Sequence, residues 1–143
     1  MAGEGLDERR ARNLDAVRAA WAGIEASDAA QMLAGYTEDM VLELPYGSPP
    51  KRIEGRQAAL DYLSGGLGAF ELHLTIDEVH PTLDPDELII EFSGSGSFRP
   101  TGAAYENRYI AVYRFRDGRI CHQREYYNPA ASPTGGKAVG DAG

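Results

Sequence analysis

The chain has 143 residues, enough for one domain with a buried core, and its formal net charge is −8 at pH 7. Binding to a phosphate backbone needs clustered lysine and arginine, so we expect no nucleic acid partner. Cys121 is the only cysteine, which excludes an intramolecular disulfide and a cysteine-based metal cluster. The first residues lack the pattern of a signal peptide, and no apolar run approaches ~20 residues, so we expect a cytoplasmic protein without membrane contact.

The start of the chain predicts two helices. Apolar residues at spacings of three and four predict an amphipathic helix over residues 6–25. These residues are Leu14, Val17, Trp21 and Ile24. A shorter helix should begin at an N-cap in Ser27-Asp28 and include Tyr36 on its apolar face. The polar residues 37–39 should end it.

The next stretch predicts two short strands and a third helix. Residues 40–44 alternate in polarity, which predicts a strand, and the three prolines of residues 45–50 predict a loop. A brief strand at 53–55 should lead into a helix over residues 56–63. The glycines that follow this helix should end it.

From Phe70 onward the pattern changes to strands. Residues 72–77 alternate in polarity, and an apolar run from Leu88 starts another strand that continues into glycines and serines. Glycine within a strand indicates bending or a close backbone approach. Two further strands flank Asp117-Gly118, and this dipeptide predicts a tight hairpin, because a type I′ turn needs positive φ at both central residues.

These elements together predict an α+β fold. We expect a cone-shaped α+β barrel in which a curved antiparallel sheet wraps around three N-terminal helices. Residues 1–129 should form this single domain. Residues 130–143 contain few large apolar side chains, so we expect a flexible C-terminal tail there.

Three motifs in the last third of the chain carry a resemblance to a known superfamily. They are Tyr105-Glu106-Asn107, the aromatic run into the Asp117-Gly118 turn, and the ending Arg124-Glu125-Tyr126-Tyr127-Asn128-Pro129. With the order of the elements, they resemble the SnoaL-like branch of the nuclear transport factor 2-like superfamily over most of residues 14–129. The sequence looks closest to the phenazine-biosynthesis A/B proteins within it.

The resemblance implies a role for Glu125. In the phenazine proteins the carboxylate of the Arg-Glu pair lies in the cavity and acts as an acid. A carboxyl among aromatic side chains loses solvation, which raises its pKa and keeps a proton available near neutral pH. The residues alone leave open a second interpretation, in which Arg124 and Glu125 form an ion pair in solvent.

Strand alternation divides the last strand between two faces. One face should carry Cys121, Gln123, Glu125 and Tyr127. The other should carry Ile120, His122, Arg124 and Tyr126. Both sets contain aromatic residues, so the alternation does not decide which face lines the pocket, whereas the resemblance selects the Glu125 face.

The sequence departs from two branches of the superfamily at residues with chemical roles. The steroid isomerases have a general base before a proline, where this chain has Leu44, and they have an acid and a tyrosine near Ala111 and Ala20. The histidine and serine of the phenazine proteins fall at Tyr62 and Gly66. The resemblance therefore does not imply either family's own reaction.

Other residues could bind a substrate. His73 could be a second acid or base, or a half-buried strand histidine. The candidate substrate-binding residues are Tyr46, Tyr62, Asn107, Tyr109, Gln123 and Tyr127. Each tyrosine could instead belong to the core or a dimer interface, and Asn107 could instead cap a bulge. The spacing of the three histidines predicts no metal site.

The function we expect is that of a cofactor-independent tailoring enzyme of secondary metabolism. It would catalyse a cyclisation, isomerisation or dehydration of an apolar, aromatic or polyketide-like substrate, with Glu125 transferring the proton. A second hypothesis is a non-catalytic carrier with the same pocket, and a third is an inhibitory partner of a related enzyme. We expect a homodimer that pairs through the open face of the sheet.

Overall fold

The computed structural model describes residues 5–131. Three helices come from the first half of the chain: α1 Leu6–Glu25, α2 Ala29–Leu33 and α3 Arg56–Ser64. The strands are β1 Tyr36–Leu44, β2 Lys51–Glu54, β3 Phe70–Pro81, β4 Glu87–Phe98, β5 Ala103–Arg116 and β6 Arg119–Tyr127. Two 3₁₀ turns, η1 Leu67–Ala69 and η2 Pro129–Ala131, precede β3 and follow β6.

The six strands form one sheet in the order β2-β1-β6-β5-β4-β3. All neighbouring strands are antiparallel except β1 and β6, which are parallel. The prediction of a fully antiparallel sheet is wrong at this pair, because the first and last strands meet only after the chain has passed through α3 and the long strands β3–β5. The α+β cone itself is confirmed.

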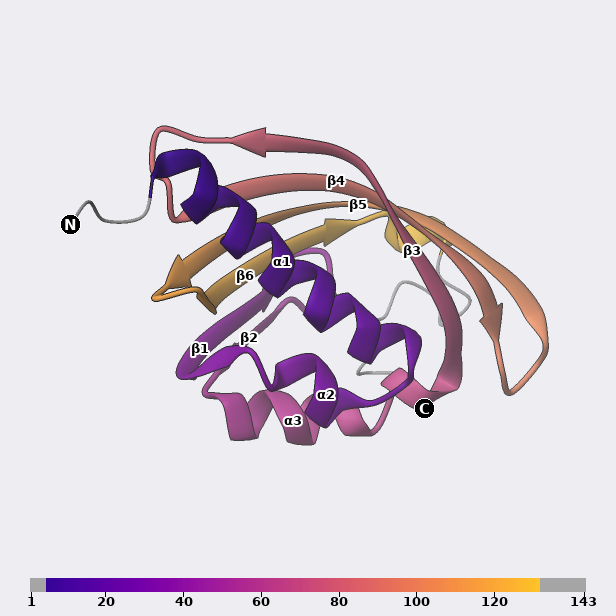
Figure 1. The fold of residues 1–143 in the computed structure, drawn as a ribbon. Coiled ribbons are helices and arrows are strands. Elements are labelled where there is room, and N and C mark those ends of the chain that lie inside the picture. The colour runs from indigo at the N-terminus through magenta and orange to yellow at the C-terminus, as the bar shows by residue number, and fades with distance from the viewer. Residues whose placement is uncertain (1–4, 132–143) are drawn as a thin grey trace.

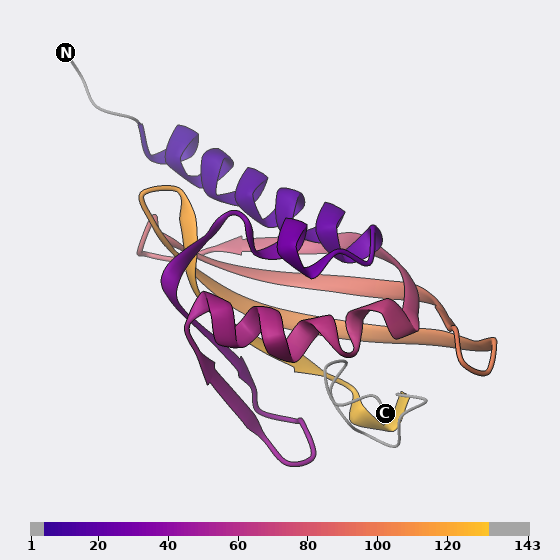
Figure 2. The ribbon, with the colours of Figure 1, turned by 90° about the horizontal axis from the view of Figure 1, so that it is seen from below.

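The helices fill the concave side of the curved sheet (Figures 1 and 2). Their apolar faces pack on strand residues that point inward, so one core joins both layers. Its members include Val17, Trp21, Met40, Leu42, Ile90, Phe92 and Tyr113. We call this concave, helix-covered side of the sheet the inner face and the opposite side the outer face.

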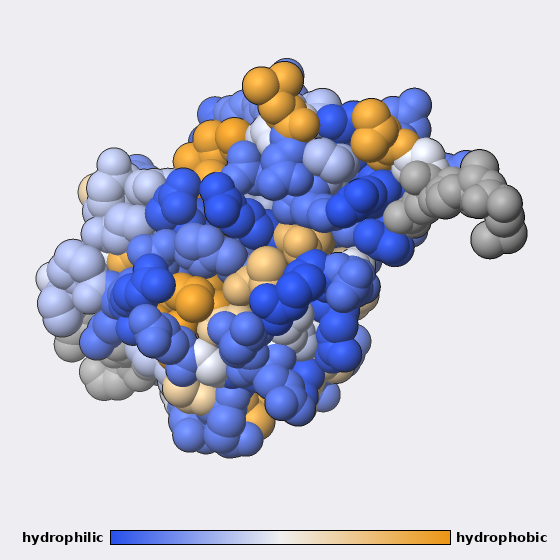
Figure 3. All heavy atoms as spheres, turned by 90° about the vertical axis from the view of Figure 1, so that its left-hand side faces the viewer, coloured by the Kyte–Doolittle hydropathy of each residue, from blue (hydrophilic) through white to orange (hydrophobic). Residues whose placement is uncertain are grey.

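The end of the molecule with the start of α1 and the β5–β6 turn is mainly hydrophilic, with apolar side chains in separate groups (Figure 3). The large apolar residues exposed within the described range are Leu6, Tyr46, Leu83 and Ile110. No helix between residues 5 and 131 is long and apolar enough to cross a membrane.

The closing hairpin forms as predicted, with one difference in its alternation. Asp117 and Gly118 have φ values of 53° and 78°, the positive values that the turn requires. The register then skips Cys121, since Phe115 pairs with Ile120 and Arg114 pairs with His122. This β-bulge turns Ile120 into the core, so the prediction that Ile120 shares a face with His122 is wrong.

The start of β1 also differs from the prediction. The Asp28 side chain accepts a hydrogen bond from the Gln31 backbone N–H at 3.0 Å and caps α2, which ends at Leu33. Tyr36 is therefore a strand residue paired with Ile120 of β6, not a helix residue, and the polar residues 37–39 continue the strand. Pairing with a strand more than 80 residues away overrides the local helical pattern.

The predicted domain boundary at residue 129 falls within η2, which continues to Ala131. The remainder of the predicted tail, residues 132–143, lies outside the described residues.

Candidate active site

Glu125 lies on the inner face of β6, directly opposite Ala111 of β5. Gln123 and Tyr127, which flank it on the same face, are both buried. Glu125 itself is half-buried, so it keeps surface that water can reach. Burial raises the pKa of its carboxyl from the ordinary 4.5 to about 7, against the opposing effect of a hydrogen bond from Gln123. At neutral pH this carboxyl is therefore able both to give and to take a proton.

A buried amide connects Glu125 to Tyr36. The Gln123 Nε2 donates to Glu125 Oε1 at 3.2 Å, and the Tyr36 hydroxyl donates to Gln123 Oε1 in a very short hydrogen bond. Tyr36 is 1% exposed and Gln123 is 3% exposed, so water does not compete for these bonds. The chain of bonds engages one oxygen of the Glu125 carboxyl and leaves the other for a different partner.

Tyr113 offers a second polar group beside Glu125. It pairs with Gln123 across β5 and β6, one inward position from the Ala111–Glu125 pair. The Trp21 Nε1–H of α1 donates to the Tyr113 hydroxyl oxygen at 3.2 Å. This bond uses a lone pair of the oxygen, so the hydroxyl hydrogen is directed elsewhere. Burial and the Glu125 charge raise the pKa of Tyr113 well above its usual range, which keeps this hydroxyl a donor.

Tyr109 and Tyr105 form a further hydroxyl pair on β5, with their oxygens 2.8 Å apart. The Tyr109 ring stacks on Phe92 with a centroid distance of 4.7 Å. Burial, followed by interactions with Tyr105, Glu125 and Tyr127, raises the pKa of Tyr109 far above its usual range. The inner face thus surrounds one titrating carboxyl with phenols that stay protonated.

Among the predicted substrate-binding residues, Gln123 and Tyr109 lie in this cluster. Tyr127 is 9% exposed, and its hydroxyl donates to the Tyr46 backbone oxygen at 3.4 Å. Tyr46 itself is 55% exposed and packs edge-on against Tyr126 of the outer face, with centroids 5.4 Å apart. Tyr62 lies on α3, where the Lys51 ammonium is 6.0 Å from its ring centroid.

Asn107 is engaged in a structural contact. Its amide nitrogen donates to the Tyr105 hydroxyl and to the Asn128 backbone oxygen, both at 3.0 Å. Its amide oxygen accepts from the Asn128 backbone N–H, also at 3.0 Å. This residue therefore fixes the chain where it leaves β6, a structural contact that differs from the bulge cap considered for it, because the β4–β5 register has no bulge at Asn107.

The structure does not bring His73 to Glu125. The His73 side chain is 72% exposed on β3, and its Nδ1 lies 2.5 Å from a carboxylate oxygen of Glu25 in α1. We therefore leave His73 out of the candidate active site.

Sequence reasoning missed Tyr36, Trp21 and Tyr113. Tyr113 could have been found, since it is four residues from Tyr109 and therefore shares its strand face. Tyr36 was hidden by its assignment to a helix, and Trp21 by the ordinary explanation of an aromatic on an apolar helix face as core.

One group of potential metal ligands lies apart from this cluster. Glu78, His80 and Glu91 place their ligand atoms within 4.8 Å of one another, the one such group found in residues 5–131. Glu78 and Glu91 are opposite each other on β3 and β4, and His80 Nε2 lies 2.6 Å from Glu91. Burying Ile90 and Phe92 directs Glu91 to the outer face. The group therefore has no part in the chemistry of Glu125.

Comparison with known sequences assigns the family. A model of the SnoaL-like domain matches residues 14–123. The uncharacterised protein YesE of Bacillus subtilis (strain 168) is 38% identical over 97 residues, which cover 66% of this chain and 66% of YesE, just under two thirds of its length. The uncharacterised PhzA/B-like protein PA3332 of Pseudomonas aeruginosa is 34% identical over 112 residues, which cover 74% of this chain and 77% of that protein.

Solved structures of similar proteins have the same fold. A candidate isomerase from Bacillus subtilis has a TM-score of 0.80 at 32% identity and covers 86% of this chain and 91% of its own. The RV0760c protein of Mycobacterium tuberculosis, in complex with estradiol-17beta-hemisuccinate, has a TM-score of 0.72 at 25% identity, over 84% of this chain and 96% of its own. A candidate polyketide cyclase from Xanthomonas campestris pv. campestris has the same TM-score and identity, over 84% and 93%. With the motifs, the cone and the match over residues 14–123 in agreement, this chain belongs to the SnoaL-like domain family.

Proposed function

We propose that this protein is a cofactor-independent isomerase or cyclase of secondary metabolism that moves a proton through Glu125. The observation that carries the proposal is a single carboxyl, with a pKa near 7, on the inner face of the sheet among protonated tyrosines. Isomerase and cyclase relatives with the same fold support the reaction class. The substrate would be a largely apolar ring compound, in keeping with the aromatic surroundings.

The chemistry follows from the two groups that flank the site. Ionised Glu125 takes a proton from a carbon next to a substrate carbonyl. The electron pair of the broken C–H bond forms a C=C bond, and the π pair of the carbonyl moves onto its oxygen. The Tyr113 hydroxyl, oriented by Trp21, donates a hydrogen bond to that oxygen as its charge grows. Protonated Glu125 then returns the proton to another carbon, so the reaction is an isomerisation with no net loss of atoms.

The test uses an unconjugated cyclic enone whose isomerisation to the conjugated enone is followed by ultraviolet absorbance. Glu125→Gln should lower kcat by about 10²-fold or more, because the amide cannot carry the proton. Glu106→Gln is the matched control, since Glu106 is exposed on β5 of the same hairpin, and it should leave kcat unchanged. Equal rates for wild type and Glu125→Gln would contradict the proposal. Tight binding of the enone without turnover in wild type would favour the carrier hypothesis.

We also propose a homodimer through the outer face. A groove of about 410 Å³ on this face is lined by residues that include Tyr46, Asp77, Glu91, Arg108 and Ile110. Tyr46 and Ile110 expose apolar surface, while the acidic Asp77 and Glu91 come from β3 and β4 and the basic Arg108 comes from β5. Two copies related by a two-fold axis could place Asp77 and Glu91 of each copy near Arg108 of the other. Sedimentation should give twice the 15.5 kDa chain mass, and Ile110→Asp should give the monomer.

A further inference from the structure

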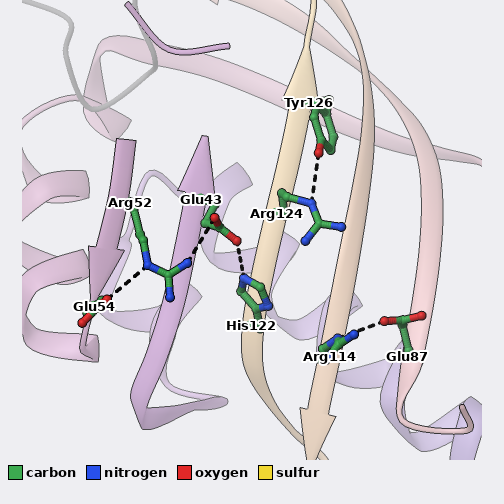
Figure 4. Close-up of polar contacts among 8 residues, drawn as sticks. All are labelled: Glu43, Arg52, Glu54, Glu87, Arg114, His122, Arg124 and Tyr126. Atoms are coloured by element: carbon green, nitrogen blue, oxygen red, sulfur yellow. Dashed lines mark hydrogen bonds and ion pairs between the residues drawn. The ribbon is translucent and has the colours of Figure 1, made fainter. Parts of the chain in front are cut away.

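The charges on the two faces of the sheet differ in kind. On the outer face, Glu43 accepts from His122 at 2.6 Å and pairs with Arg52 at 3.1 Å, and Arg114 pairs with Glu87 at 2.9 Å (Figure 4). Carboxylates and cations therefore alternate across that face. Figure 4 also shows Arg124 turned toward Tyr126, to which its Nε donates at 3.0 Å, although Arg124 adjoins Glu125 in the sequence.

On the inner face, Glu125 has no cation beside it within the described part of the chain. The polar contact of its carboxyl is the Gln123 hydrogen bond at 3.2 Å, and no arginine, lysine or histidine in residues 5–131 forms an ion pair with it. The raised pKa agrees, since burial and this hydrogen bond are the interactions that set it. The buried polar residues in this range are uncharged: Asn13, Thr37, Asn107 and Gln123. Lys51, which lies near the Tyr62 ring, does not contribute to the Glu125 pKa.

The tyrosines whose pKa values the Glu125 charge affects are neutral at physiological pH. Tyr36 of β1 and Tyr105, Tyr109 and Tyr113 of β5 each have a pKa raised first by burial and further by the Glu125 charge. Helix α1 contributes the indole of Trp21, which does not titrate. A ligand at this carboxyl therefore meets one ionisable group of negative charge and several neutral donors.

Resting on the proposed function, we infer that the site selects a substrate whose reacting end is neutral or carries a basic amine, and that it rejects one whose reacting end is a carboxylate or phosphate. An anion would face an uncompensated carboxylate in surroundings of low dielectric. An amine would supply the cation that Glu125 lacks among residues 5–131, and a charge-assisted hydrogen bond would form. A neutral carbonyl or hydroxyl group would accept hydrogen bonds from the tyrosine hydroxyls, and Glu125 would neither repel it as an anion nor attract it as a cation.

Three ligands of one shape and different charge separate these cases. They are 2-naphthylmethanol, 2-naphthylmethylamine and 2-naphthoate, titrated into the full-length protein by isothermal titration calorimetry at pH 8. The amine should bind more tightly than the alcohol, and naphthoate should bind about tenfold more weakly or worse than the alcohol. At pH 5.5 the carboxyl is protonated, so the advantage of the amine over the alcohol should disappear.

Variants assign the effect to Glu125. Glu125→Gln should remove the advantage of the amine at pH 8 and bring naphthoate closer to the alcohol, whereas Glu106→Gln should change neither ratio. Circular dichroism of each variant verifies that it is folded. Naphthoate binding as tightly as the alcohol in wild type would overturn the charge inference while leaving proton transfer by Glu125 intact. No binding of any of the three at millimolar concentration would overturn the inference together with the proposed ligand site. If Glu125→Gln lost turnover but the wild type did not show the expected affinity ratios, proton transfer by Glu125 would stand and the charge inference would fall.

Discussion

Arg124 and Glu125 are neighbours in sequence, but their side chains lie on opposite faces of β6 and in opposite electrostatic settings. Arg124 lies on the outer face, where it contacts Tyr126 and where nearby carboxylates have cationic partners. Glu125 lies on the inner face with no counter-ion among the described residues and with a pKa near 7. The comparison shows that charged side chains on the outer face form ion pairs with one another. The Glu125 carboxylate on the inner face has no such partner among the described residues, and its ionisation lowers the stability of the fold.

The largest effect we expect on stability comes from removing that unpaired charge. The folded-state pKa of Glu125, about 7, is above its ordinary 4.5, so the folded state binds the proton more tightly than the unfolded state does. This stabilisation is complete below pH 4.5 and is lost as the pH rises through 7. At pH 8, Glu125→Gln should therefore be more stable than wild type by up to about 3 kcal/mol.

Denaturant unfolding of both proteins between pH 4 and pH 8 checks this prediction. The stability difference should be near zero at pH 4 and should grow steadily with pH. A difference that does not depend on pH would mean that Glu125 titrates at its ordinary value.

The next effect concerns the hydrogen bonds that hold Glu125. Tyr36→Phe removes the donor to Gln123 and leaves a buried amide oxygen unpaired, which should cost about 1–2 kcal/mol of unfolding free energy. A looser Gln123 donates less well to Glu125, so the pKa of Glu125 should rise further. Tyr126→Phe is the matched control on the outer face and should change the Glu125 pKa little. If Tyr36→Phe left both stability and pKa unchanged, Gln123 would not depend on Tyr36 for its orientation.

The smallest effect should come from the outer face. Burial raises the pKa of Glu43, but the bonds and charges of His122 and Arg52 outweigh it and leave the pKa below its ordinary value. Glu43→Gln should cost about 1 kcal/mol or less, as for other partly exposed ion pairs. The stabilisation by the Glu43 ion pairs is present above the pKa of Glu43 in the unfolded state and is lost as the pH falls through its lowered folded-state pKa. The Glu43 contribution therefore increases with pH, whereas the Glu125 contribution decreases with pH. Unfolding at low and high salt should show a salt-dependent cost, and turnover should not change.

Much of the fold could be predicted because its signals are local. The Asp117-Gly118 turn, the apolar spacing of α1 and the alternation of β5 depend on neighbours in sequence. The parallel contact of β1 with β6, the strand conformation of Tyr36 and the bulge at Cys121 depend on pairing between distant segments, which no local pattern encodes.

The candidate site was predictable to a smaller extent. Resemblance placed Glu125 on the inner face, and the same face holds Gln123 and Tyr109 in the structure. The role of Asn107 could not be read from the sequence, because its partner Asn128 lies 21 residues away, directly after the end of β6. The sequence alternation could not predict that the His73 side chain would be 72% exposed, because alternation does not give the exposure of a side chain on β3.

Direct titration of the Glu125 carboxyl tests the central claim most closely. The protein is labelled with ¹³C at glutamate side chains, the Glu125 signal is assigned by its absence in Glu125→Gln, and its shift is followed from pH 3 to pH 9. We expect a midpoint near 7, well above those of the exposed glutamates. A midpoint near the ordinary 4.5 would contradict both the proton-transfer role and the electrostatic contrast between the two faces of the sheet.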